Sequence, residues 1–100
     1  MNLDFSQFTL KENIASQNLS ALLGPVITAM KDPDAKVRFQ ACETMYNITK
    51  SLRAIILPNF NDIFATLICI ISDFDEDVKK IVQQLDRVLK DVVSEGIIDR

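Results

Sequence analysis

The sequence contains no histidine, only two glycines and only two cysteines among its 100 residues. Because Cys42 and Cys69 are far apart and no histidine accompanies them, the chain lacks the ligands of a zinc site. Gly24 and Gly96 are too widely separated to form a glycine-rich phosphate loop. No spacing pairs a nucleophile with a lysine or carboxylate base. We therefore expect a protein that is not an enzyme and uses no metal and no cofactor.

Basic stripes, signal sequences and long apolar runs are also missing. The net charge is −3 with scattered lysines and arginines, which excludes a phosphate-binding surface and argues against a nucleic-acid partner. Residues 1–6 have neither the charged nor the apolar region of a signal peptide. The longest apolar run, residues 63–71, is about half the length of a membrane span. These features predict a cytoplasmic protein without direct membrane insertion.

Two similar acidic turns are what the sequence does contain. Residues 32–38, DPDAKVR, lead into a run with apolar residues at Val37, Ala41, Met45 and Ile48. A weaker copy, DFDEDVK, occupies residues 73–79, 41 positions later. This period lies within the range of about 40–47 residues found in HEAT and armadillo arrays. The repetition favours helical hairpins of a scaffold over the architecture of a catalyst.

The first expected hairpin has an outer helix with apolar residues three and four positions apart, which places them on one face: Leu19, Leu22, Leu23, Val26, Ile27 and Met30. Gly24 and Pro25 should kink this helix or mark a restart. Asp34 is the expected N-cap of the inner helix, which runs to about residue 51. Arg38, four residues on, should support that cap electrostatically and contribute less to stability than the cap itself.

The second expected hairpin begins near Pro58, a residue suited to the first turn of a helix. Its outer helix has one apolar face formed by Phe60, Ile63, Phe64, Leu67 and Ile71. Its inner helix has an apolar stripe formed by Val78, Ile81, Val82, Leu85, Leu89 and Val92. This helix should end near Gly96, because glycine suits a C-terminal cap. Cys42 and Cys69 fall within helices and are expected to be small buried residues, with a disulfide as the alternative.

Together these patterns predict an all-α, HEAT/armadillo-like α-solenoid fragment of about two helical hairpins plus an N-terminal segment. The hairpins are expected at 19–52 and 53–96, followed by a tail at 97–100. Residues 1–18 contain Leu3, Phe5, Phe8, Leu10 and Ile14, which mix periods of two and four. We interpret residues 1–18 as an N-terminal cover or a partial helix. Solenoid repeats do not close their own core, so a longer array, a partner or these residues should cover the ends.

Charged and polar residues on the two inner helices form the candidate partner-binding surface. Adjacent repeats stack their inner helices side by side, which creates the concave surface that solenoids use for partners. The candidate contact residues are Arg38, Glu43, Asn47, Lys50, Asp86, Arg87 and Lys90. The alternative for any one of them is a salt bridge between repeats or a simple contribution to solubility.

Four sequence blocks occur together in an order and spacing that resemble one family. They are Pro25-Val26 before the first acidic turn, Ala41-Cys42-Glu43 with Tyr46-Asn47-Ile48, Leu57-Pro58-Asn59-Phe60-Asn61, and LDRVLKDVVSE at residues 85–95. Over residues 19–96 the chain resembles the Fab-one-binding region of the vacuolar HEAT-repeat scaffold that organises a PIKfyve-type phosphoinositide kinase. A generic HEAT repeat would supply the turn but not the other blocks together.

The resemblance implies a non-catalytic scaffold module that binds a PIKfyve-type phosphatidylinositol-3-phosphate 5-kinase. That complex makes and turns over phosphatidylinositol 3,5-bisphosphate, so the implied location is the cytoplasmic surface of endosomal or vacuolar membranes, reached through the complex. Further copies, or the rest of the same scaffold, are additional implied partners. The alternative is a generic HEAT-repeat adaptor with another protein partner.

Overall fold

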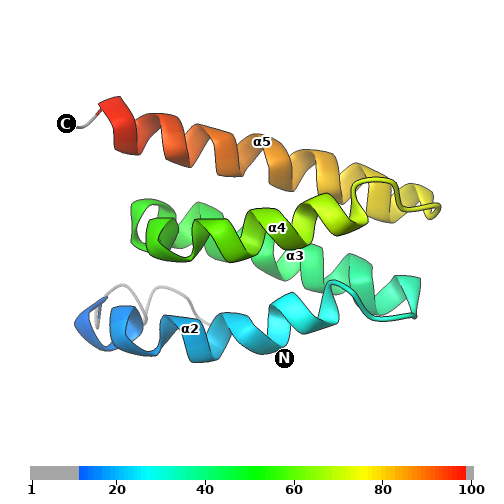
Figure 1. The fold of residues 1–100 in the computed structure, drawn as a ribbon, viewed down its shortest axis with the longest axis horizontal. Coiled ribbons are helices and arrows are strands. Elements are labelled where there is room, and N and C mark those ends of the chain that lie inside the picture. Colours follow the sequence, from blue (N-terminus) through cyan, green and yellow to red (C-terminus); the bar gives the residue numbers. More distant parts are fainter. Residues whose placement is uncertain (1–11, 99–100) are drawn as a thin grey trace.

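The computed structural model describes the backbone of residues 12–98 and the side chains of residues 19–95. The elements in chain order are α2 (Glu12–Ala29), α3 (Ala35–Leu52), the 3₁₀ helix η1 (Arg53–Asn59), α4 (Phe60–Ile70) and α5 (Glu76–Ile98). The α-helices alternate in direction and form two hairpins, α2 with α3 and α4 with α5 (Figure 1). The inner helices α3 and α5 pack against each other, and η1 contacts both. The prediction of an all-α helical-repeat fold is confirmed.

The two acidic turns use the same capping chemistry. Asp34 accepts a hydrogen bond from the backbone N–H of Lys36 at 2.9 Å, which confirms it as the N-cap of α3. Asp75, 41 positions later, accepts hydrogen bonds from the N–H groups of Asp77 at 2.9 Å and Val78 at 3.1 Å. In both turns a carboxylate thus satisfies N–H groups that the first turn of a helix leaves unpaired.

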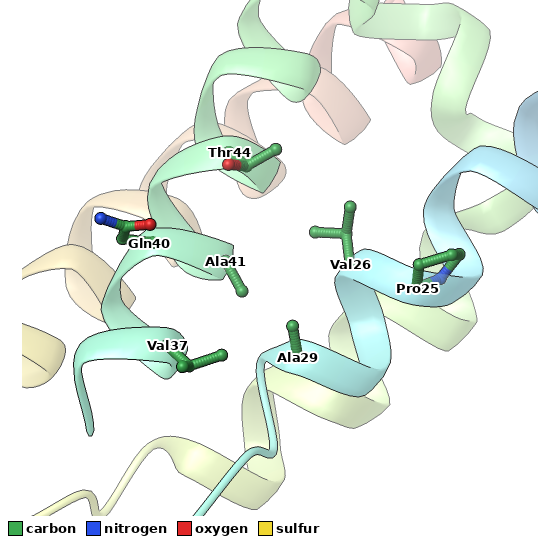
Figure 2. A pocket seen from close by; sticks show the side chains of 7 residues that line it. All are labelled: Pro25, Val26, Ala29, Val37, Gln40, Ala41 and Thr44. Atoms are coloured by element: carbon green, nitrogen blue, oxygen red, sulfur yellow. The ribbon is translucent and has the colours of Figure 1, made fainter. Parts of the chain in front are cut away.

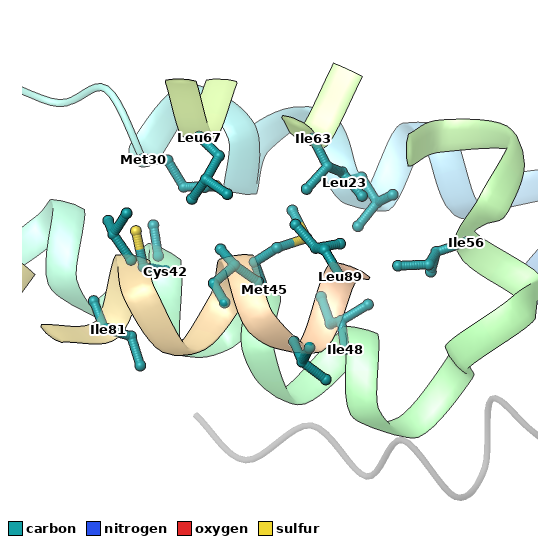
Figure 3. Packing of buried hydrophobic residues seen from close by; sticks show 14 of the residues in the cluster. Leu23, Met30, Cys42, Met45, Ile48, Ile56, Ile63, Leu67, Ile81 and Leu89 are labelled. Atoms are coloured by element: carbon teal, nitrogen blue, oxygen red, sulfur yellow. The ribbon is translucent and has the colours of Figure 1, made fainter. Parts of the chain in front are cut away.

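The hydrophobic core lies between the hairpins and is built from all four described α-helices (Figure 3). The close view places Leu23 and Met30 of α2 beside Ile63 and Leu67 of α4, above the inner helices. All six residues of the predicted stripe on α5 are buried, as are Leu19, Leu23 and Met30 on α2. The apolar periods of the sequence therefore identified the buried faces of α2 and α5.

Several detailed predictions are wrong. Helix α2 continues through Pro25, which excludes a restart, the second of the two alternatives given for this position. Helix α5 continues through Gly96 to Ile98, so Gly96 does not end the helix. Val37 was expected to be buried with the other apolar residues of its helix but is 37% exposed, and Ile71, from the apolar face expected on the second outer helix, is exposed as well. Helix α2 begins at Glu12, within the segment interpreted as an N-terminal cover or a partial helix.

One stretch passes a compositional test for a membrane span. Within Ala35–Ile70, an 18-residue window reaches a mean hydropathy of 1.4. The chain reverses direction inside this stretch at η1, so α3 and α4 run antiparallel rather than forming one long helix (Figure 1). The buried side chains of both helices belong to the core. Only 28% of that window is buried, so packing between the hairpins accounts for part of its apolar composition.

Candidate functional site

The period of 41 residues allows each position of α3 to be compared with its counterpart on α5. Cys42, Met45 and Thr49 of α3 are buried in the interface between the hairpins. The hydroxyl of Thr49 donates to the carbonyl oxygen of Met45 at 2.8 Å, so this polar side chain is satisfied within its own helix. The counterparts of these three residues on α5 are Gln83, Asp86 and Lys90. Their face of α5 is open, with Gln83 and Lys90 exposed and Asp86 half-buried.

The open face of α5 carries three of the predicted contact residues. Asp86 and Lys90 form an ion pair with 3.0 Å between Oδ2 and Nζ, and Arg87 lies between them in the sequence. Together with Gln83 and Asp91 they line an open hollow of about 440 Å³. Because a single helix supplies the whole lining, the hollow is a shallow shelf rather than an enclosed pocket. Such a shelf suits protein side chains better than a small molecule, which usually binds in a deep concave site.

A second row of predicted contact residues lies on α3. Glu43, Asn47 and Lys50 are exposed and are separated by four and three positions, so they occupy one face of the helix. Lys50 is further oriented by Tyr46, because its Nζ lies 5.4 Å from the centroid of the Tyr46 ring. The structure therefore places these three residues on one exposed face of α3.

Arg38 differs from the other predicted contact residues because it joins the two acidic turns. Its guanidinium donates to both carboxylate oxygens of Asp73, at 2.7 and 3.1 Å, and to the carbonyl oxygens of Asp32 and Pro33 at 2.9 Å. The Arg38 and Asp73 side chains are only 18% and 6% exposed. The hydrogen bond from Arg38 holds the pKa of Asp73 below its usual value. The hydrogen bond to Asp73 raises the pKa of Arg38, and Asp34 contributes electrostatically to this rise, as expected, but the hydrogen bonds of Arg38 go to Asp73 and to the carbonyl oxygens of the first turn.

A second ion pair joins the opposite ends of the hairpins. The guanidinium of Arg53, at the C-terminus of α3, donates to both carboxylate oxygens of Glu95 near the end of α5. These side chains are 38% and 57% exposed, so solvent screens this pair more than the pair in the turns. The hydrogen bond from Arg53 lowers the pKa of Glu95. Both ion pairs join residues at least 35 positions apart. Helical spacing relates only residues a few positions apart, so neither pair could be predicted from it.

The two cysteines have different environments. Cys42 is buried in the core, and this burial raises the pKa of its thiol to about 11. Cys69 is exposed, so the expectation of a buried residue holds for Cys42 and is wrong for Cys69. Both are free thiols, which removes the disulfide alternative. Within residues 19–95, no three or more acidic or cysteine side chains gather in a group that could hold a metal ion.

An apolar stripe along α4, exposed at its C-terminal end, was not predicted from the sequence. The single apolar face expected there is split, because Ile63 and Leu67 are buried whereas Phe60 and Phe64 are half-buried. The Phe60 and Phe64 rings stack with centroids 5.2 Å apart. Ile68, Ile71 and Phe74 extend the stripe into the second turn, where Phe74 is 97% exposed. Ile68, Ile71 and Phe74 follow Phe64 in steps of four, three and three positions, a helical spacing that could have predicted this second apolar face.

Comparison with known proteins gives one matching family model. The model for the Vacuolar 14 Fab1-binding region matches residues 1–91, which include both acidic turns and most of α5. No solved structure matches the chain.

Three curated relatives are similar to the chain. The protein VAC14 homolog of Arabidopsis thaliana is 41% identical over 82 residues, covering 82% of this chain and 11% of the relative. The vacuole morphology and inheritance protein 14 of Saccharomyces cerevisiae is 38% identical over 95 residues, which cover 95% of this chain and 11% of the relative. The VAC14 homolog of Schizosaccharomyces pombe is 39% identical over 75 residues, which cover 75% of this chain and 9% of the relative. The chain thus spans about a tenth of the length of these relatives.

Proposed function

The chain belongs to the Vacuolar 14 Fab1-binding region family, and from this membership we propose that it is a scaffold module that binds a Fab1/PIKfyve-type lipid kinase. The observation that carries the proposal is the family match over residues 1–91, which agrees with the resemblance seen in the sequence blocks. In this role the chain serves the complex that makes and turns over phosphatidylinositol 3,5-bisphosphate. Its place is then on vacuolar or endosomal membranes, reached through the complex.

A scaffold role is also supported by where the perturbed ionisable groups lie. The shifted pKa values of Asp73 and Glu95 follow from ion pairs that join the hairpins, and that of Cys42 follows from burial in the core. Catalytic groups, in contrast, have perturbed pKa values inside a cleft that can hold a substrate. In the part of the chain with described side chains, these shifts arise from ion pairs between the hairpins and from burial in the core.

The proposed kinase-binding surface consists of the two open rows on the inner helices. Glu43, Asn47 and Lys50 form the row on α3, and Asp86, Arg87 and Lys90 form the row on α5. Both rows carry charges of both signs, so the matching surface of the kinase should alternate in charge as well. Exposed charges contribute to association through forces that salt screens over about 8–10 Å. Arg38 acts indirectly, because it holds the turn from which α5 begins.

Capture of the kinase by the immobilised chain tests this surface. We expect Arg87→Glu with Lys90→Glu to reduce capture strongly, because both residues lie on the open face of α5. The matched control is Lys79→Glu with Lys80→Glu, which changes the net charge equally on exposed positions of the same helix. The control should capture the kinase as well as wild type. Both variants should keep the helical circular dichroism melt of wild type.

A charge exchange on α3 provides a second test without any change in net charge. Glu43→Lys with Lys50→Glu reverses the row while preserving its composition, so we expect weaker capture with an unchanged melt. If both folded double variants capture the kinase as well as wild type, the proposed surface is wrong. If wild type does not capture the kinase at all, the generic HEAT adaptor becomes the better interpretation.

A further inference from the structure

An open cleft lies between the starts of the two inner helices, and both hairpins line it. Its volume is about 260 Å³. Ala35, Lys36, Phe39 and Gln40 come from α3, and Asp75 and Asp77 come from the second turn and the start of α5. Small-molecule sites usually enclose about 300–1,000 Å³, so this cleft is better suited to a single side chain of a partner protein.

A second hollow on α3 shows what is particular to the cleft. The groove between α2 and α3 has a volume of about 280 Å³ and a lining without charged residues (Figure 2). The cleft has a similar volume, but two carboxylates, one ammonium group and one aromatic ring line it. Gln40 borders both, and Figure 2 shows its amide pointing away from α2, whereas Val37 and Ala41 point toward α2. The cleft is therefore the hollow that suits a charged ligand.

The charges in the cleft favour a positively charged ligand. Two carboxylates and one ammonium group give the lining a net charge of −1. The carboxylate of Asp75 is held in place, because its Oδ1 accepts hydrogen bonds from the N–H groups of Asp77 at 2.9 Å and Val78 at 3.1 Å. A carboxylate has about four lone-pair sites, so Asp75 can accept further hydrogen bonds. Each helix N-terminus contributes a partial charge of about +0.5, which Asp34 offsets at α3 and Glu76 offsets at α5.

Phe39 adds an aromatic surface for such a cation. Its half-buried side chain packs against the core and also lines the cleft. The face of an aromatic ring carries partial negative charge and attracts cations. The same arrangement occurs two turns later on α3, where Nζ of Lys50 lies 5.4 Å from the centroid of the Tyr46 ring. Phe39, Glu43 and Tyr46 are four and three positions apart, so the cleft continues the α3 row of the proposed kinase-binding surface.

We propose that this cleft holds the side chain of an arginine from the kinase, with the guanidinium stacked on the ring of Phe39 and donating to Asp75 and Asp77. A guanidinium is planar, stacks on aromatic rings and donates through several N–H groups in its plane, so it can use the ring and both carboxylates at once. A lysine ammonium is a compact point charge without a stacking face. Lys36 opposes the bound arginine because their charges are alike. The identity of the partner rests on the proposed function, whereas the chemistry of the cleft does not.

Titration of the full chain with short peptides, followed by nuclear magnetic resonance, tests the cleft itself. The probe is acetyl-Gly-Arg-Gly-amide, and the control peptide has citrulline, an uncharged analogue of nearly the same shape, in place of arginine. We expect saturable shifts of the Phe39 ring and Asp77 amide resonances with the arginine peptide and no such shifts with the citrulline peptide. Equal shifts with both peptides, or none with either, overturn the proposal.

Two substitutions in the cleft should act in opposite directions. Asp77→Asn should weaken binding of the arginine peptide about two- to fivefold, the range of one exposed ion pair. Lys36→Met should strengthen binding by a similar factor, which a loss of folding cannot do. Asp62→Asn is the charge-matched control, because Asp62 is exposed on α4 and does not line the cleft. Affinities that fall for both cleft variants, or change for neither, contradict the proposal.

Capture of the kinase by the immobilised chain tests the identity of the partner. Asp77→Asn should reduce capture, whereas Lys36→Met and Asp62→Asn should not. If the arginine peptide binds but Asp77→Asn captures the kinase as well as wild type, the arginine does not belong to the kinase and that part of the proposal is overturned. If wild type captures no kinase, the proposed function fails together with the kinase's arginine, and binding of the arginine peptide would then support the cleft for another protein partner.

Discussion

Helices α3 and α5 hold equivalent places in their repeats but bury different faces. Helix α3 buries Cys42, Met45 and Thr49, whereas α5 exposes Gln83 and Lys90 and half-exposes Asp86 at the corresponding positions. Helix α5 instead buries Val78, Ile81 and Leu85 at positions where α3 is open. Corresponding positions of the repeat are therefore buried on one inner helix and open on the other, because each inner helix has the other hairpin on a different side.

The largest expected difference between the inner helices is in the loss of stability when Leu85 or its counterpart Thr44 is replaced by alanine. Leu85 is fully buried, so Leu85→Ala should lower the free energy of unfolding by about 2–5 kcal/mol. Thr44 is its half-buried counterpart, and Thr44→Ala should change stability by no more than about 0.5 kcal/mol. Urea denaturation followed by circular dichroism measures both. Equal midpoints for the two variants would show that the faces are not differently buried.

The next largest difference should separate Arg38 from its counterpart Lys79. Arg38 makes four hydrogen bonds that join the two turns, whereas Lys79 makes an exposed ion pair with Glu76 at 3.2 Å. Arg38→Ala should therefore lower the denaturation midpoint clearly more than Lys79→Ala, and more than loss of the Asp34 cap. This order reverses the expectation from sequence. A midpoint for Arg38→Ala equal to that of Lys79→Ala would contradict the role of the turn-to-turn pair.

The N-caps should instead behave alike, which makes them a test of similarity between the repeats. Asp34 and Asp75 each accept hydrogen bonds from N–H groups at the start of an inner helix. Asp34→Ala and Asp75→Ala should each lower the free energy of unfolding by about 1 kcal/mol. Thermal melts of the single variants measure this. A wild-type melt for either variant would remove its cap assignment.

The smallest effect concerns acidification of the two ion pairs. The pKa of Asp73 is lowered in the folded protein, so its stabilising contribution is complete above the unfolded pKa of about 4 and is lost as pH falls below that value. Asp73→Asn should be less stable than wild type at neutral pH and lose less stability on acidification. Glu95→Gln should show the same trend more weakly, because its pair with Arg53 is more exposed. Parallel stability curves for wild type and Asp73→Asn would contradict this linkage.

Much of the fold followed from local patterns in the sequence. The spacing of the α5 stripe placed all six of its residues in the core, and the acidic turn identified the Asp34 cap. Both signals depend on residues within a few positions of one another. The family blocks likewise identified the family that the model comparison found.

What could not be predicted depends on contacts between distant parts of the chain. The ion pair of Arg38 with Asp73 was not predicted, because the two residues are 35 positions apart and helical spacing carries no information about such contacts. Val37 was expected to be buried because it shares helical spacing with Ala41 and Ile48, but in the structure it is 37% exposed whereas its counterpart Val78 is fully buried. Whether the two open rows bind the kinase likewise depends on the surface of the kinase, so the sequence of this chain alone could not predict it.

Direct titration of a Fab1/PIKfyve-type kinase with the full chain, at low and at high salt, tests the central claim most directly. The account predicts saturable binding whose affinity falls as salt rises, because exposed charges on α3 and α5 contribute to the contact. Saturable binding that salt does not weaken would contradict the charged inner-helix surface. The absence of binding at low salt would contradict the proposed function itself.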